Sequence, residues 1–187
     1  MQINNYIHIT LLVEMQNLGF KQIDPKEIPG NLIKLIADEW MLVTAGTKEK
    51  FNTMTANWGG AGYLWNRPVA FVFVRPERFT YNFTEESESF TLSFYDEKYR
   101  EALNICGVKS GRDCDKIKEA ALTPIFTNKG LPAFEEAKIV LEVRKIYADM
   151  LSQDAFLDKE PIKNHYLTKG NLHKLYIVQI ESVWVKG

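Results

Sequence analysis

The sequence predicts a mainly β fold with helical insertions. Ile139–Tyr147 and Leu175–Val185 are long segments rich in β-branched and aromatic residues, as in long strands. Val69–Val74 is apolar throughout, which is typical of a strand buried on both faces. Helical patterns lie between the strands without a regular strand–helix alternation, and this favours a barrel-like β protein over a βαβ sheet.

The composition fits one globular domain. The chain has 187 residues, of which 45% are hydrophobic and 12% aromatic, enough to bury a sizeable core. Charged residues make up 25% and leave a net charge of −1. A nucleic-acid surface and a polybasic membrane patch are therefore not predicted, and no apolar run approaches the length of a membrane span.

Residues 1–20 are expected to form an N-terminal arm or extension, and residues 21–187 the main domain. Tyr6–Val13 fits a strand and Glu14–Leu18 a helical turn. The first twenty residues hold no Lys or Arg, and their longest apolar run stops at Glu14, so no secretory signal is expected. The two cysteines, Cys106 and Cys114, do not make a disulfide framework, and reduced thiols in a cytoplasmic protein are expected.

The strands are predicted from apolar and alternating segments. Ile28–Ala37 fits a short helix, and Trp40–Ala45 is β-branched and aromatic enough for a strand. Thr53–Trp58 and Val69–Val74 follow as strands. Phe90–Phe94 alternates between apolar and polar residues, so we expect a half-buried strand there.

Two helices are predicted between Phe94 and Ile139. Asp96 is placed to cap a helix that Gly107 closes and whose apolar face is Tyr99, Ala102, Leu103 and Cys106. Cys106 then reads as a small core residue, with a redox thiol as the minor alternative. Asp113 is placed to cap a second helix that runs towards Ala121 and stops before Pro124.

The segment from Asn52 to Gly62 has an unusual pattern for a core strand. If it is extended, Thr53, Thr55 and Asn57 share one face, while Met54, Ala56 and Trp58 share the other. Gly59, Gly60 and Gly62 follow, and glycines let a flat ligand approach backbone N–H and C=O groups. The pattern favours a planar cofactor with polar edges, although threonines are also common on a solvent-facing strand.

A second polar segment runs from Ser110 to Lys116. Ser110 and Gly111 lead into a predicted helix start, where free N–H groups and the helix dipole favour an anion. Arg112 and Lys116 add cations suited to a phosphate. The alternative is a capped surface helix with ordinary charges.

Further candidates follow the buried strand Val69–Val74. Arg78 is favoured over Arg75 as a ligand residue, and Thr80 and Tyr81 come directly after it. Trp58 and Trp65 fit either ring stacking on a cofactor or core packing. The three histidines, His8, His165 and His173, show no metal spacing, and surface positions are favoured over contacts to a nicotinamide. Hydrolase, NTPase and Rossmann motifs are absent from the sequence.

These segments, in this order, resemble the flavin reductase-like, FMN-binding split-barrel family that includes flavoredoxin. The resemblance rests on Asn52-x-Met-Thr-Ala-x-Trp-Gly-Gly60, Trp65-x-x-Pro-Val69, Val74-Arg-Pro-x-Arg-x-Thr-Tyr81 and Phe90–Phe94. It continues through Cys106-Gly-x-x-Ser-Gly-Arg-Asp-x-Asp-Lys116, Phe134–Ala137 and His173-Lys-x-Tyr-Ile177. It covers roughly Phe20 to Lys186.

The resemblance implies a six-stranded antiparallel split barrel that forms a homodimer with one FMN per subunit. It implies cofactor binding by Asn52, Thr53, Met54, Thr55, Ala56, Asn57, Trp58, Arg78, Thr80, Tyr81, Ser110, Gly111, Arg112 and Lys116. Donors along the first strand would meet the polar edge of the flavin, and the Ser110–Lys116 segment its phosphate. Family members more often carry Ser where this chain has Asn57.

The implied function is redox chemistry on that FMN. NADH or NADPH would reduce the flavin, which would pass electrons to free flavin, another small molecule or a protein. A flavoredoxin-type electron carrier without nicotinamide turnover is the first alternative. A flavin-free interaction module is the second. The absence of a protein acid–base dyad is consistent with hydride transfer, which depends on stacking geometry.

Overall fold

The computed structural model describes residues 15–167 and 171–187, so the expected strand Tyr6–Val13 lies outside the described residues. The strands are β1 (Phe20–Ile23), β2 (Met41–Gly46), β3 (Phe51–Ala56), β4 (Gly59–Leu64), β5 (Arg67–Val74), β6 (Ser89–Phe94), β7 (Pro124–Phe126), β8 (Pro132–Phe134), β9 (Ile139–Met150) and β10 (Lys174–Lys186). The α-helices are α1 (Leu32–Lys34), α2 (Phe79–Glu86), α3 (Arg100–Val108), α4 (Lys116–Glu119) and α5 (Glu160–His165). Leu35–Glu39 continues α1 as a π-helix, and short 3₁₀ turns cover Met15–Leu18, Pro25–Glu27, Glu97–Tyr99 and Gln153–Ala155.

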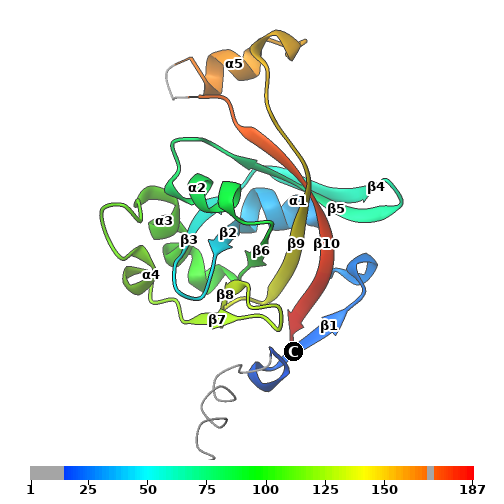
Figure 1. Ribbon diagram of the computed structural model, residues 1–187, viewed down its shortest axis with the longest axis vertical. Helices are drawn as coiled ribbons and strands as arrows, with labels where there is room; N and C mark the ends of the chain where they lie inside the picture. Colours follow the sequence, from blue (N-terminus) through cyan, green and yellow to red (C-terminus); the bar gives the residue numbers. More distant parts are fainter. Residues whose placement is uncertain (1–14, 168–170) are drawn as a thin grey trace, which may run out of the picture.

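One antiparallel sheet organises the molecule (Figure 1). Its order is β3-β2-β6-β9-β10-β5-β4, and β1 adds to β10 to make eight strands; β7 and β8 form a separate hairpin. The mainly β antiparallel fold is thus confirmed, with eight strands in the main sheet where six were expected. β4 gives a weak strand signal because glycine has a low β propensity, and β1 does so because four residues are too few to show a clear alternation.

The long strand β10 is where the sheet divides. β9 pairs with β10 from Lys174 to Val185. The opposite edge of β10 is shared, because β5 pairs with Lys174–Gln179 and β1 with Val183–Lys186. The sheet therefore branches along this edge, with the β5–β4 hairpin beside the first half of β10 and β1 beside its last residues (Figure 1).

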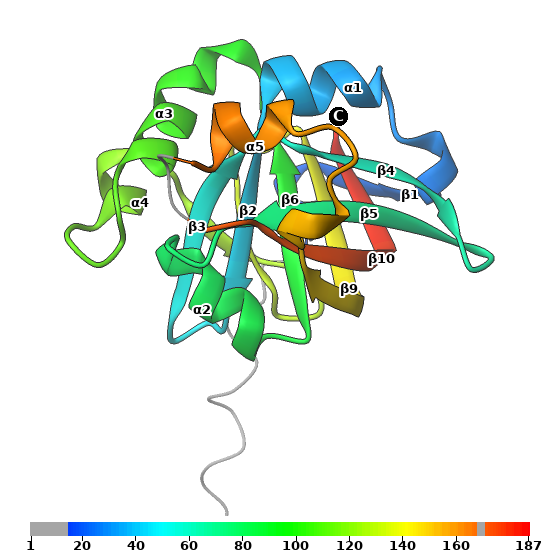
Figure 2. The ribbon, with the colours of Figure 1, turned by 90° about the horizontal axis from the view of Figure 1, so that it is seen from above.

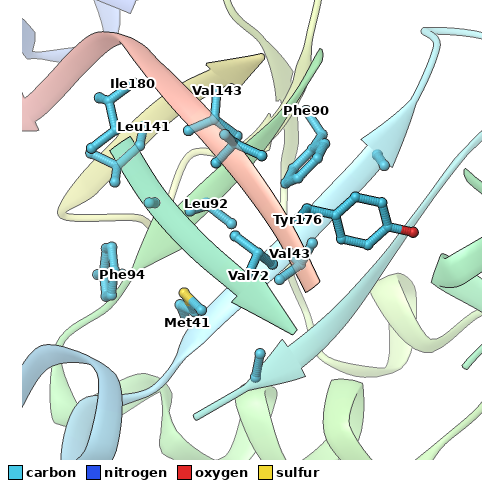
Figure 3. Close-up of a cluster of buried hydrophobic side chains, with 14 of the residues drawn as sticks. Met41, Val43, Val72, Phe90, Leu92, Phe94, Leu141, Val143, Tyr176 and Ile180 are labelled. Carbon is cyan, nitrogen blue, oxygen red and sulfur yellow. The ribbon is translucent and has the colours of Figure 1, made fainter. Parts of the chain in front are cut away.

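The sheet curls round one apolar core (Figure 3). Met41, Val72, Leu92, Leu141 and Tyr176 bring five different strands into this cluster. A second cluster covers the other side of the sheet, where Leu42, Val140 and Trp184 pack with residues of α3 and of the β7–β8 hairpin. Helix α3 thus covers the outside of the barrel, while α2 and the π-helix add Phe83, Leu35 and Ile36 to the interior core.

Several local expectations are corrected. All five residues of Phe90–Phe94 are buried, because β6 lies between β2 and β9 and both of its faces are covered. In β5, Phe71 and Phe73 are partly exposed, so this strand is not buried on both faces. Helix α4 begins at Lys116, and its cap is the side chain of Asp115. Gly107 lies inside α3, one residue before its end.

Figure 2 shows α5 over the end of the sheet, with α3 and α4 on one side and the β4–β5 hairpin projecting on the other. The α5 segment is part of the insertion 151–173 between β9 and β10. Across the described ranges, no helix is both long and apolar enough to cross a membrane.

Candidate functional site

A pocket of about 220 Å³ opens where β3 and β5 end and β10 begins. Its lining residues are Met54, Thr55, Ala56, Asn57, Trp58, Phe73, Arg75, Arg78 and His173. Whole small ligands typically occupy about 300–1,000 Å³. A pocket of this volume fits one planar part of a larger ligand, with the remainder lying outside it.

The first wall of the pocket is the end of β3. Within the part of the chain that the structure describes, β3 is an edge strand that pairs with β2. Alternate backbone N–H and C=O groups therefore point away from β2, where a ligand with polar edges can meet them. Met54 and Ala56 belong to the interior core, as the predicted alternation requires.

The side chains of Thr53 and Thr55 hydrogen-bond within the protein. The hydroxyl of Thr53 lies 2.8 Å from that of Thr44 and 3.3 Å from the carbonyl oxygen of Val43. Thr55 donates to the carbonyl oxygen of Leu103 and so ties β3 to α3. Both hydroxyls are therefore engaged within the protein, and the backbone of this strand, which was expected to make most of the flavin contacts, is left to meet a ligand.

Trp58 leaves the strand, which ends at Ala56, and its side chain is 39% exposed. The alternation that placed Trp58 with the core residues therefore stops before it. Its ring forms part of an aromatic cluster instead, with centroids 4.9 Å from His165 and 5.1 Å from His173. Asn57 is exposed and also lines the pocket.

Arg78 joins the pocket to the end of α3. Its Nη1 donates to the carbonyl oxygen of Gly107 at 2.7 Å, and its Nη2 donates to that of Cys106 at 3.2 Å. These carbonyls belong to the last turn of α3, which lacks helical partners and carries the negative end of the helix dipole. Burial lowers the pKa of Arg78, with a smaller opposing effect from Cys106. Arg78 therefore holds α3 against the start of α2 while it lines the pocket.

Lys116 reaches the end of α3 from α4 and shares the carbonyl of Cys106 with Arg78. Its Nζ lies 3.4 Å from the carbonyl oxygens of Cys106 and Lys109, and the residue is only 3% exposed. Burial lowers its pKa to about 8. The ammonium is thus held beneath the turn that follows α3, where its hydrogen bonds go to backbone carbonyls.

The Ser110–Arg112 turn lies against the start of α2. A Cβ on Gly111 would stand 2.4 Å from Oδ1 of Asn52 and 3.2 Å from the Phe79 ring, so the fit requires glycine. Asn52 is buried and donates to the hydroxyl of Thr80 at 2.8 Å. Asn52 and Thr80 thereby fix β3, α2 and the turn in one arrangement.

Arg112 adds an exposed cation to this corner. Its guanidinium lies 4.8 Å from the Phe79 ring, and Nη1 donates to the carbonyl oxygen of Glu77 at 3.0 Å. Arg78 precedes α2 without a side-chain cap, so the first turn of the helix keeps backbone N–H groups for a ligand. Backbone donors, a helix start and Arg112 together suit a phosphate.

His173 is a site residue that the sequence reasoning placed on the surface. It is 8% exposed, lines the pocket, and its Nδ1 lies 2.8 Å from the hydroxyl of Tyr166. Burial and then the charge of Arg75 lower its pKa to about 4, so the ring is neutral at pH 7. His173 directly precedes β10, whose first residue pairs with Val74 at the end of β5 beside the pocket. A prediction of this strand pairing would have indicated that His173 lies near the pocket.

Other candidates lie away from the pocket. Tyr81 faces Glu85 and Lys174 on α2 and β10. Trp65 sits at the tip of the β4–β5 hairpin, 55% exposed, so it does not flank the pocket. Gly59 is needed for the close pairing of β4 with β5, because a Cβ at this position would stand 2.7 Å from the carbonyl oxygen of Phe71. The thiols of Cys106 and Cys114 are free, and burial raises the pKa of Cys106 to about 11, which disfavours a reactive thiolate.

The arrangement fits FMN. The open edge of β3 matches the alternating donors and acceptors of an isoalloxazine ring, and the pocket has room for a planar group. Arg78 lines this pocket and directly precedes Phe79, against which Gly111 and Arg112 lie at the corner where a phosphate suits the donors present. Of the fourteen residues expected to bind cofactor, the pocket is lined by Met54, Thr55, Ala56, Asn57, Trp58 and Arg78. The corner holds Asn52, Thr80, Ser110, Gly111 and Arg112, with Lys116 buried beside it, while Thr53 bonds to Thr44 and Tyr81 faces Glu85.

Solved structures of other proteins share the fold of this chain. The chain resembles the FMN-binding domain of a flavin reductases-like enzyme from Shewanella baltica OS155, with a TM-score of 0.65, 16% identity, and coverage of 89% of this chain and 77% of that chain. An FMN-binding protein from Thermus thermophilus with bound 1-cyclohex-2-enone gives a TM-score of 0.63 at 19% identity, over 86% of this chain and 79% of that one. Flavoredoxin from Desulfovibrio vulgaris (Miyazaki F) gives 0.60 at 22% identity, over 78% and 68%.

These likenesses show the fold. No curated protein sequence matches the chain. The model of the family described as flavin reductase like domain matches residues 33–187, which is most of the chain and includes β3, β5, Arg78 and the Ser110–Arg112 turn. The chain therefore belongs to the flavin reductase-like domain family.

Proposed function

We propose that this protein is an FMN-binding oxidoreductase that works as an NAD(P)H-dependent flavin reductase. The observation that carries the proposal is the pairing of an open strand edge at the pocket with an anion-binding corner, joined by Arg78. A planar ring and a phosphate at the two ends of one molecule are the features of FMN that this pairing would recognise.

Each group of residues has a role in this proposal. The backbone of 54–57 orients the flavin ring, and the Ser110–Arg112 turn with the start of α2 holds the phosphate. Arg78 and the buried Lys116 keep the surroundings of the phosphate positive. The bound flavin supplies the redox chemistry. The protein's part is to orient the flavin and to place the side of the ring that meets the electron donor beside Trp58 and His173.

The test is an anaerobic absorbance measurement on the FMN-loaded protein. Addition of NADH or NADPH is expected to bleach the flavin band within seconds, and the faster of the two names the preferred donor. A flavin that dithionite bleaches but neither nicotinamide reduces would contradict the reductase. Absence of a flavin band after incubation with FMN and desalting would leave a dissociable-substrate reductase or a flavin-free module.

A flavoredoxin-type electron carrier is the second candidate. It is favoured by the likeness to the Desulfovibrio flavoredoxin and by the exposed rim of the pocket at Asn57 and Trp58, where a partner protein can approach the flavin. It predicts tight FMN binding with negligible nicotinamide turnover. The enone in the Thermus thermophilus structure makes small enones a further acceptor class to assay.

We also propose a homodimer. The β4–β5 hairpin projects from the body and carries Tyr63, 63% exposed, and Trp65, 55% exposed (Figure 1). Two large aromatic side chains on one projecting hairpin form the kind of surface that a second copy of the chain would cover. A cytoplasmic location is proposed on the strength of the two free thiols.

A further inference from the structure

The aromatic wall of the pocket is assembled from three distant parts of the chain. Trp58 follows β3, Phe73 lies in β5, and His173 precedes β10. The ring of His173 is 5.1 Å from that of Trp58 and 6.4 Å from that of Phe73, measured between centroids. The wall therefore offers flat apolar faces at the end of the pocket that lies beyond β3.

A polar pair lies behind this wall. The hydroxyl of Tyr166 is 2.8 Å from Nδ1 of His173. The phenol is the stronger acid of the two and the neutral imidazole nitrogen the stronger base, so the hydroxyl donates to Nδ1. The ring proton of His173 is then on Nε2. Nδ1 is engaged by Tyr166 and His173 lines the pocket, so Nε2–H is the donor that the ring keeps for a ligand there.

The charge around this donor selects what it binds. Arg75 lines the same pocket, and its guanidinium is held by the carbonyl oxygen of His165 at 2.9 Å and by the Tyr166 ring at 5.2 Å. Among the described residues that line the pocket, none is acidic. A neutral N–H donor between aromatic faces, beside a fixed cation, matches an electron-rich carbonyl oxygen on a planar molecule.

We propose that His173, oriented by Tyr166, donates a hydrogen bond from Nε2 to the conjugated carbonyl oxygen of the planar molecule that exchanges electrons with the flavin. This inference rests on the proposed function. His173 is the residue that touches this molecule, and Tyr166 is a positioning residue that fixes the imidazole tautomer. The carbonyl belongs either to a nicotinamide carboxamide or to a conjugated acceptor such as a quinone.

The experiment measures ligand affinity on oxidised protein saturated with FMN, so that altered FMN affinity does not enter. One probe is 1,4,5,6-tetrahydro-NADH, which keeps the carboxamide and transfers no hydride. The other is menadione, which has conjugated carbonyls and no nicotinamide. Perturbation of the flavin absorbance band gives the Kd of each probe without turnover.

His173→Phe keeps an aromatic ring against Trp58 and removes the donor. It is expected to lower the affinity for one or both probes about three- to tenfold, the equivalent of one neutral hydrogen bond. Tyr166→Phe is expected to weaken the same probe about twofold, and His173→Gln to restore part of the affinity through its amide N–H. His165→Phe is the matched control, because that ring also packs on Trp58 but does not line the pocket.

The pattern of effects names the source of the carbonyl. If only the binding of tetrahydro-NADH is weakened, His173 contacts the nicotinamide. If only the binding of menadione is weakened, His173 contacts the acceptor. Unchanged affinity for both probes in His173→Phe, equal effects in His165→Phe, or failure of both probes to bind FMN-loaded wild-type protein would overturn the proposal. Failure of the wild-type protein to bind FMN at all would instead overturn the proposed function.

Discussion

His173 is a buried imidazole whose protonation is coupled to folding. Burial and the nearby charge of Arg75 lower its pKa to about 4, against an opposing effect of Glu77 and a further lowering by His165. In the unfolded chain a histidine has a pKa of about 6.5. The unfolded chain therefore binds more protons than the folded one between these values, and folding free energy is lost as the pH falls through this window.

We predict that His173→Phe makes the protein less sensitive to acid. Between pH 7 and pH 5 the wild-type protein should lose roughly 1–2 kcal/mol more of its free energy of unfolding than the variant, because the full slope for one proton is about 1.4 kcal/mol per pH unit. Urea unfolding at the two pH values measures this difference. Equal losses in both proteins would show that His173 is not held neutral by the fold.

Arg112 provides the second prediction at the level of single residues. Its exposed guanidinium beside Phe79 is placed to meet the phosphate, so Arg112→Ala should lower the affinity for FMN by about 1.5–3 kcal/mol. Fluorescence titration measures it. Riboflavin, which lacks the phosphate, is the control ligand and should lose no affinity. A loss that is equal for FMN and riboflavin would place the effect at the ring and contradict the assignment.

Lys116 tests the same assignment from inside the protein. The ammonium of Lys116 contacts the carbonyls of Cys106 and Lys109, and the residue is only 3% exposed. Lys116→Ala should therefore lower the affinity for FMN less than Arg112→Ala does. The double change Arg112→Ala with Lys116→Ala should weaken FMN more than Arg112→Ala alone. Identical FMN affinity in the single and double variants would remove Lys116 from the site.

At the scale of the elements, the apolar patterns predicted the long strands well. β9 and β10 follow directly from their β-branched sequences, and β3 from its alternation up to Ala56. Helix α2 was not predicted, because its aromatic and β-branched residues favour a strand. Tertiary packing decides it: the rings of Phe79 and Phe83 meet edge to face with centroids 5.2 Å apart, and both lie in or against the core. Such a preference cannot be seen before the partners are known.

The site was predicted at the level of segments more than of contacts. The sequence placed the β3 segment and the Ser110–Lys116 segment in it because glycines, cations and a helix start are local signals. It did not show that Thr53 and Thr55 turn their hydroxyls into the protein. Nor did it show that His173 enters the pocket, because that depends on the insertion between β9 and β10.

The contact between the turn and α2 yields a prediction for these elements. Gly111→Ala puts a Cβ 2.4 Å from Oδ1 of Asn52, so the turn must move away from β3 and α2. We expect a loss of about 1–3 kcal/mol in the free energy of unfolding, together with weaker FMN binding. Gly62→Ala is the matched control, since a Cβ there meets nothing within 4 Å. Equal stability of the two variants would mean that the turn is not held in this position.

At the scale of the whole molecule, the exposed hairpin gives a prediction on assembly. Light scattering during size-exclusion chromatography should give twice the 21.6 kDa mass of one chain. Tyr63→Ser combined with Trp65→Asn should shift the protein towards the monomer without unfolding it, because Asn tolerates the φ of 50° found at Trp65. A monomeric wild-type protein would contradict the homodimer, and an unaffected dimer in the double variant would exclude the hairpin from its interface.

The eight-stranded sheet serves the site by bringing three chain segments to one end of the barrel. β3 supplies an open edge, β5 leads into Arg78 and α2, and β10 follows directly after His173. A crystal structure of the protein soaked or grown with FMN tests this account most directly. We predict the isoalloxazine ring against the backbone of 54–57 and the phosphate against the Ser110–Arg112 turn. FMN bound elsewhere, or with its phosphate in the pocket beside His173, would contradict it.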